Sequence, residues 1–124
     1  MVKRSSWNKV GALDEQYSPY GWEDADWCRR AKEKNLKLVY FPQAVVVHYL
    51  HQSVKKTGGR QVEFYLSGIY YYKKHFGKPL AVIVALYILA YSVLRIAVSF
   101  LRPSRSLTRI QLFRLIRGIL LFRI

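Results

Sequence analysis

The sequence predicts an α/β domain followed by membrane-associated helices. Three observations lead to this fold class: a helical charge pattern at 23–34, two runs rich in β-branched and aromatic residues within 37–49, and an apolar run at 80–101. The apolar run has 22 residues, and a helix needs about 20 to cross the hydrocarbon core of a bilayer. A chain of 124 residues is therefore expected to hold one modest domain with an attachment segment behind it.

Charge is distributed unevenly along the chain. Residues 1–79 hold 14 Lys and Arg and all seven Asp and Glu, whereas residues 80–124 hold seven Arg and no acid. The arginines of the second part are set among Leu, Ile, Val and Phe, which suits an anionic lipid surface better than a nucleic-acid duplex. We therefore expect a membrane, and no nucleic acid, among the partners. Nucleic-acid binding through the net charge of +14 is the weaker interpretation.

The first elements follow from turn residues and charge order. Residues 4–21 are expected to form a short helical turn and then a loop, since glycine and proline punctuate them. A helix should run from Glu23 to about Lys34, because acids in its first turn and bases near its end complement the helix dipole. Asn35 is a suitable stop, because Asn tolerates the left-handed conformation.

The next segments predict strands and then helices. Residues 37–49 should form two short strands or one bent strand around Pro42 and Gln43. A basic, glycine-containing loop should follow at 53–60, and the apolar spacing of 61–77 predicts a helix.

The C-terminal part is expected to attach the chain to a membrane. We expect 80–101 to be a transmembrane or re-entrant helix, with an interfacial helix as the alternative. Residues 102–124 should form a basic, apolar interfacial tail, because arginines scatter among its apolar residues and blur the amphipathic pattern.

The stretch YGWEDADWCRRA at 20–31 is the strongest candidate for chemistry, since it holds three of the seven acids. Acids at the start of a helix and bases at its end occur on many ordinary surface helices, so the charge pattern alone favours a structural role. Asp26 and Arg30, at i and i+4, are expected to pair in such a role. Trp22 and Trp27 place large apolar faces beside the carboxylates, and such faces suit a sugar, which offers one apolar face and several hydroxyls.

Residues 7–49, WNKVGALDEQYSPYGWEDADWCRRAKEKNLKLVYFPQAVVVHY, resemble the C-terminal part of family 2 glycosyltransferases, especially the bacterial rhamnosyltransferase-like members. The matching residues are Val10, Gly11, Leu13, Asp14, Glu15, Tyr20, Glu23, Asp24, Asp26, Cys28, Arg30, Pro42, Ala44 and His48. The Glu-Asp pair alone is a weak signal, whereas the order and spacing of the whole string are specific. The resemblance implies that 1–79 is the acceptor-side, C-terminal portion of a GT-A-type nucleotide-sugar transferase fold.

The resemblance also implies an activity. The parent enzyme would transfer a sugar from a nucleotide-sugar donor to an acceptor hydroxyl of a surface glycan or lipid-linked glycan. Asp24 takes the role of the general base, which removes the acceptor proton as the oxygen attacks the anomeric carbon. Trp22 and Glu23 are placed in the acceptor-binding site.

The donor side is less complete. The resemblance implies a divalent cation, Mg²⁺ or Mn²⁺, with His48 as a candidate ligand, although a lone His after a β-rich run is most often a packed residue. Lys55, Lys56 and Arg60 are candidate contacts to the donor diphosphate, and the alternative is a solvated basic loop. No Asp-x-Asp motif precedes the Glu-Asp pair, so the N-terminal, donor-binding half is expected to be missing.

Two functional classes remain open at this point. In the first, the chain is a piece of a membrane-associated glycosyltransferase with a cytoplasmic catalytic part, is at best marginally folded alone and is inactive by itself, and Met1 is an internal methionine of a longer or truncated gene. In the second, it is a non-enzymatic basic membrane protein or partner subunit whose acidic helix is only structural.

Overall fold

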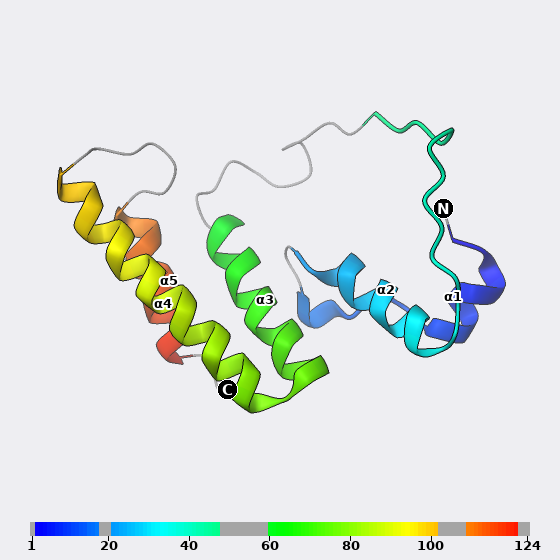
Figure 1. Ribbon diagram of the computed structural model, residues 1–124, viewed down its shortest axis with the longest axis horizontal. Helices are drawn as coiled ribbons and strands as arrows, with labels where there is room; N and C mark the ends of the chain where they lie inside the picture. The colour runs from blue at the N-terminus through cyan, green and yellow to red at the C-terminus, as the bar shows by residue number, and fades with distance from the viewer. Residues whose placement is uncertain (1, 18–20, 48–59, 102–108, 122–124) are drawn as a thin grey trace. The chain divides into compact units, whose positions relative to one another are not determined.

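A computed structural model of the chain describes residues 2–17, 21–47, 60–101 and 109–121 (Figure 1). The elements in order are α1 (Arg4–Val10), the 3-10 turn η1 (Glu15–Tyr17), α2 (Glu23–Glu33), α3 (Arg60–Phe76), α4 (Lys78–Leu101) and α5 (Arg109–Leu121). The chain divides into two compact units. The α2 unit comprises Met1–Glu15 and Glu23–Thr57, and the three-helix unit comprises Gln16–Trp22 and Gly58–Ile124.

The predicted α/β fold class is wrong. All regular elements in the described residues are helices, which conflicts with a GT-A-type fold built around a sheet. The two β-rich runs within 37–47 are irregular, and the Ala44 N–H donates to the Phe41 C=O at 3.1 Å across a turn at Pro42 and Gln43. A strand is stable only when its backbone groups pair with a neighbouring strand, and no described segment supplies one here. High β propensity therefore does not produce a strand.

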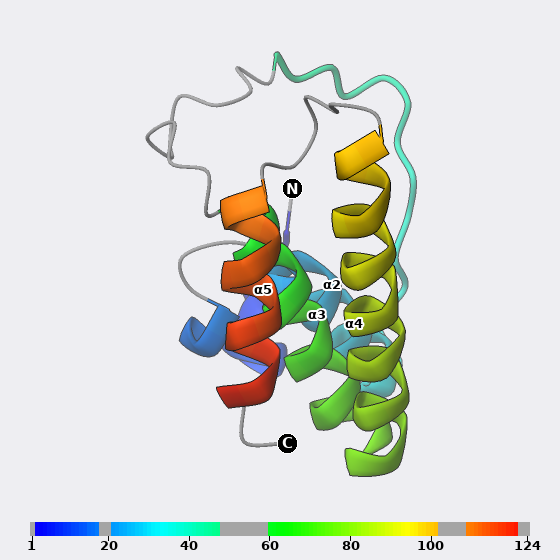
Figure 2. The ribbon, with the colours of Figure 1, turned by 90° about the vertical axis from the view of Figure 1, so that its left-hand side faces the viewer.

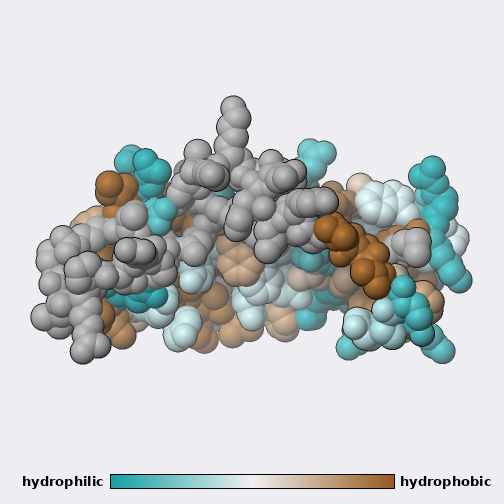
Figure 3. Space-filling model, turned by 90° about the horizontal axis from the view of Figure 1, so that it is seen from above, coloured by the Kyte–Doolittle hydropathy of each residue, from teal (hydrophilic) through white to brown (hydrophobic). Residues whose placement is uncertain are grey.

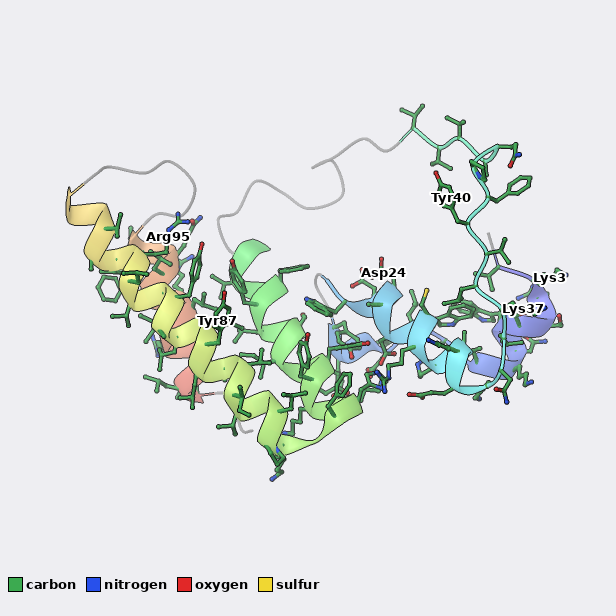
Figure 4. All side chains as sticks on the ribbon, in the orientation of Figure 1. Lys3, Asp24, Lys37, Tyr40, Tyr87 and Arg95 are labelled. Atoms are coloured by element: carbon green, nitrogen blue, oxygen red, sulfur yellow. The ribbon has the colours of Figure 1, made fainter. Side chains whose placement is uncertain are left out.

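This irregular segment leaves its apolar side chains in solvent. Seven large hydrophobic residues between positions 38 and 47 are 53% to 89% exposed, with Tyr40 the most exposed of them. Tyr40 projects from the extended trace in Figure 4, and hydrophobic atoms of this segment stand at the surface in Figure 3. The segment is therefore an exposed, strand-prone run without a partner in the described chain.

The α2 unit has a small aromatic core. Val10, Trp27 and Ala31 are its buried members, and Trp7 stacks on Trp27 with ring centroids 6.0 Å apart. The Trp27 Nε1–H donates to the Gly11 C=O at 2.9 Å, so the buried indole keeps its hydrogen bond. These contacts fix α1 against α2.

Arg30 ties the end of α1 and the residues after it to α2. Its Nε donates to Asp26 Oδ2 at 2.8 Å, and the Asp26 side chain is fully buried. Its two other nitrogens donate to the Val10 and Ala12 carbonyls at 3.0 Å and 2.8 Å. The predicted pairing of Asp26 with Arg30 is confirmed, and its role in the structure is to hold the loop after α1.

The end of α2 follows the sequence-based expectation. The helix begins at Glu23 and ends at Glu33, and Asn35 adopts a left-handed φ of 57°. The Leu36 N–H donates back to the Ala31 C=O at 3.0 Å, which satisfies one of the last carbonyls of the helix.

The three-helix unit contains the longest helices and the larger core. Helices α3 and α5 run in the same direction and α4 runs the opposite way, and the three lie side by side (Figures 1 and 2). Helix α3 ends at Phe76 and α4 begins at Lys78, so Gly77, with φ of 86°, makes the whole connection. The buried members of the core are Val62, Ile69, Ala81, Ala85, Ile88, Leu115 and Ile119.

Candidate functional site

Asp24 lies in the first turn of α2 and is exposed. The Ala25 N–H donates to its Oδ1 at 2.7 Å, and the side chain projects outward from the helix in Figure 4. A general base needs an oxygen that an acceptor hydroxyl can reach, and the exposed Asp24 carboxylate provides one.

Glu23, the preceding residue, is half-buried. Its Oε2 is buried and has no hydrogen-bond partner among the described residues. Leaving a buried polar atom unpaired costs about 1–3 kcal/mol, so native structures rarely keep one without a reason. This oxygen is closed to solvent in the described structure, so the acceptor-binding role of Glu23 stays a prediction.

Trp22 adopts a backbone conformation that is strained for a residue with a side chain, with φ of 72°. It belongs to the three-helix unit, where its ring lies 5.6 Å from Phe64 and 5.1 Å from Tyr71 between centroids. A Cβ on Gly68 would come within 3.2 Å of the indole, so the ring lies directly on the α3 backbone. The indole Nε1 is buried without a partner among the described residues.

The tyrosine run of α3 packs inside the same unit. Tyr17 is almost fully buried and meets Tyr70 edge to face with centroids 4.9 Å apart. The Lys74 ammonium lies 5.6 Å from the centre of the Tyr17 ring, within the range of a cation–π contact. Tyr17 of η1 and Trp22 before α2 therefore both pack on aromatic residues of α3.

The structure brings two of the predicted acceptor-site residues onto one helical turn. Glu23 and Asp24 are adjacent on α2, whereas Trp22 is packed on α3, so its ring is not an open stacking face of the α2 unit. Gly68 is a supporting residue that sequence reasoning missed. The only signal for it is a glycine in the middle of the helical run 61–77, which marks a close approach of another group.

The predicted donor-side residues fall mostly outside the described chain. His48, Lys55 and Lys56 lie outside the described residues, and Arg60 is the first residue of α3, although its side chain is not described. Within the described ranges no group of three or more His, Cys, Asp and Glu comes together to hold a metal ion. The divalent cation implied by the resemblance stays a prediction, because its candidate ligand His48 is not among these residues.

Comparisons with protein-family models, with curated proteins and with solved structures found no match to this chain. The resemblance of residues 7–49 to family 2 glycosyltransferases is not tested by these comparisons and stays a prediction.

Proposed function

We propose that this chain is the acceptor-side component of a membrane-attached enzyme that transfers a sugar from a nucleotide-sugar to a hydroxyl of a surface or lipid-linked glycan. The observation that carries the proposal is the combination found at two consecutive residues in the first turn of α2. Glu23 has a buried carboxylate oxygen without a partner among the described residues, and Asp24 has an exposed carboxylate. Unpaired buried polar atoms are rare in native structures and call for an explanation.

The proposed reaction needs one proton acceptor from this chain. The acceptor hydroxyl gives its proton to the Asp24 carboxylate as its oxygen bonds to the anomeric carbon. The bond between that carbon and the phosphate oxygen breaks, and its electron pair leaves with the nucleoside diphosphate. The donor-binding groups are expected to come from another segment or subunit, since no Asp-x-Asp motif precedes Glu23.

The test is sugar transfer in membranes of the cells that make the chain. Membranes are incubated with radiolabelled UDP-, GDP- and dTDP-sugars, and label is counted in the lipid extract and in the polymeric glycan. Asp24→Asn is expected to lower transfer at least about a hundredfold, because a positioned base supplies roughly 10²–10⁴ of the rate. Glu33→Gln, which removes the same charge from the far end of α2, is the matched control and should keep its activity.

Full transfer by a folded Asp24→Asn chain would remove Asp24 from the mechanism. The purified chain without its donor-binding partner is expected to be inactive. Transfer by that purified chain would therefore contradict the division of donor and acceptor sites between components.

Membrane attachment of the chain is a separate part of the proposal. By length and composition, Lys78–Val98 of α4 is long and apolar enough to cross a membrane, which is weak support on its own. We propose that the chain is membrane-associated with its catalytic part on the cytoplasmic face. Digestion of intact spheroplasts with an external protease should leave the α2 unit uncut.

A second candidate function is a non-enzymatic basic membrane protein or partner subunit. The exposed apolar side chains of α4 favour it, because they need a lipid or protein partner whether or not Asp24 is catalytic. This candidate is supported if sugar transfer is the same in membranes with and without the chain. It is also supported if Asp24→Asn leaves transfer unchanged.

A further inference from the structure

Helix α4 has two apolar faces, one packed on α3 and α5 and the other exposed. Ala81, Ala85, Ile88 and Ser92 are buried at helical spacing, and they face the other two helices of the unit. The opposite face carries large hydrophobic side chains that are exposed. These are Val82, Ile83, Leu86, Tyr87, Val93, Leu94 and Val98. Tyr87 in the middle of this outer face is labelled in Figure 4.

Helix α3 limits how deep α4 can enter a bilayer. The two helices are joined by Gly77 alone and pack along each other, so they move as one body. Helix α3 carries Lys73, Lys74 and His75 in its last turn and Glu63 in its first turn. Carrying these charged groups to hydrocarbon depth is costly, and α4 packed in this way does not cross without them.

The charge of the unit favours an anionic surface. Residues 58–124 of the unit contain eleven Lys and Arg and a single acid, Glu63. Arg95 of α4 is labelled in Figure 4. Its Nη1 donates to the Tyr91 hydroxyl, one turn earlier on the same helix, at 3.0 Å. A tyrosine and an arginine paired in this way are typical of the boundary between headgroups and acyl chains.

We propose that α3, α4 and α5 lie as one body on the surface of an anionic bilayer, with the outer face of α4 in the acyl boundary and neither end of α4 crossing. The proposal rests on the membrane attachment proposed above and goes further by fixing its geometry. It is independent of sugar transfer, so loss of one does not imply loss of the other.

The test separates a surface helix from a spanning one. The full chain is synthesised in the presence of vesicles, in a Cys28→Ser background, with a single cysteine placed by Lys78→Cys at the start of α4, Ser104→Cys three residues after its end, or Leu86→Cys on its outer face. A membrane-impermeant maleimide is then added outside, before and after the vesicles are permeabilised. Vesicles of phosphatidylcholine alone are compared with a phosphatidylcholine–phosphatidylserine mixture.

The surface geometry predicts that cysteines at both ends of α4 react from outside without permeabilisation. The cysteine at position 86 should react freely without vesicles and be protected on phosphatidylserine vesicles. Binding should be weaker on phosphatidylcholine alone, since each basic residue near an anionic surface adds about fivefold at low salt.

Two results would overturn the proposal. If one end reacts only after permeabilisation, α4 spans the bilayer and the surface geometry is wrong while membrane attachment stands. If the chain binds neither vesicle, both membrane attachment and this geometry fail.

A substitution pair gives a second measurement. Leu86→Glu is expected to lower vesicle binding about tenfold or more, because it places a charge where an apolar side chain enters the membrane. Leu38→Glu, at a similarly exposed leucine of the α2 unit (53% against 59%), is the matched control and should bind like the parent chain. Circular dichroism checks that both variants keep their helices, and equal binding by the two would contradict the proposal.

Discussion

Replacing Arg30 by methionine should destabilise the α2 unit far more than the same change at the neighbouring Arg29. Arg30 pairs with a fully buried Asp26 and also donates to two backbone carbonyls. Arg29 forms the same kind of i,i+4 pair with Glu33, but those two side chains are 34% and 53% exposed. Both substitutions keep a long side chain and remove one positive charge, so the difference between them reports burial.

The size of the effect follows from that difference. Removing one partner of a buried ion pair costs about 3–5 kcal/mol, because the remaining charge stays buried. The Arg30 side chain is 20% exposed, which lets water replace part of what is lost, so we expect about 3 kcal/mol for Arg30→Met. The Arg29–Glu33 pair is open to solvent, and its loss should cost about 0.5 kcal/mol or less.

Urea unfolding followed by tryptophan fluorescence measures both values. Trp7 and Trp27 lie in the α2 unit and Trp22 in the other, so a Trp22→Phe background makes the signal specific. With a slope of about 1–3 kcal/mol per molar urea, Arg30→Met should lower the midpoint by roughly 1–3 M. Adding Asp26→Asn should recover part of the loss, because it removes the unpaired charge. If the two arginine variants unfold within about 0.5 kcal/mol of each other, the buried pair does not hold α1 on α2.

Three further outcomes are expected. Gly118→Ala should stabilise the three-helix unit by about 0.5–1 kcal/mol in thermal melts, because the nearest atom to the new Cβ, at 3.1 Å, is the flexible tip of Leu66. Gly68→Ala should not raise the melting temperature, because its Cβ would meet the rigid indole of Trp22. Asn35→Val should cost about 1–2 kcal/mol because of its left-handed φ, and Asn35→Gly should be tolerated; equal melting temperatures would contradict that backbone assignment. Val46→Lys should reduce light scattering by the purified chain without lowering its stability, because the side chain is exposed on a strand-prone segment.

Local signals in the sequence predicted most of the helices. The charge order at 23–34 and the left-handed preference of Asn35 set the limits of α2, which ends one residue before the expected stop. The apolar run at 80–101 became α4, which begins two residues earlier because Lys78 and Pro79 join its first turn. Both signals depend on residues within a few positions of each other, and such information is present in the sequence itself.

The strands were predicted wrongly because their formation depends on distant residues. The runs around Pro42 have the composition of strands, but a strand needs a neighbour for its backbone groups, and composition does not supply one. The inner face of α5 was missed for a different reason. Leu112, Leu115 and Ile119 share one face, but the arginines between them obscured the pattern.

The candidate site was only partly predictable. Glu23 and Asp24 were located from the sequence because they are adjacent and begin a helix. The packing of Trp22 on Gly68 joins residues 46 positions apart, and only the folded chain reveals it. The buried, unpartnered oxygen of Glu23 likewise depends on what surrounds it in three dimensions.

The order of helices along the chain has a consequence for biosynthesis. Helix α5 closes the core of the three-helix unit, yet it is made after α3 and α4, and translating its 13 residues takes about 1–3 s at cellular rates. During that interval the face of α4 that α5 will cover has no apolar partner from α5. Once α5 has packed, only the outer face of α4 remains exposed. Slower synthesis of 109–121 should therefore lengthen the time during which the inner face of α4 is open to aggregation.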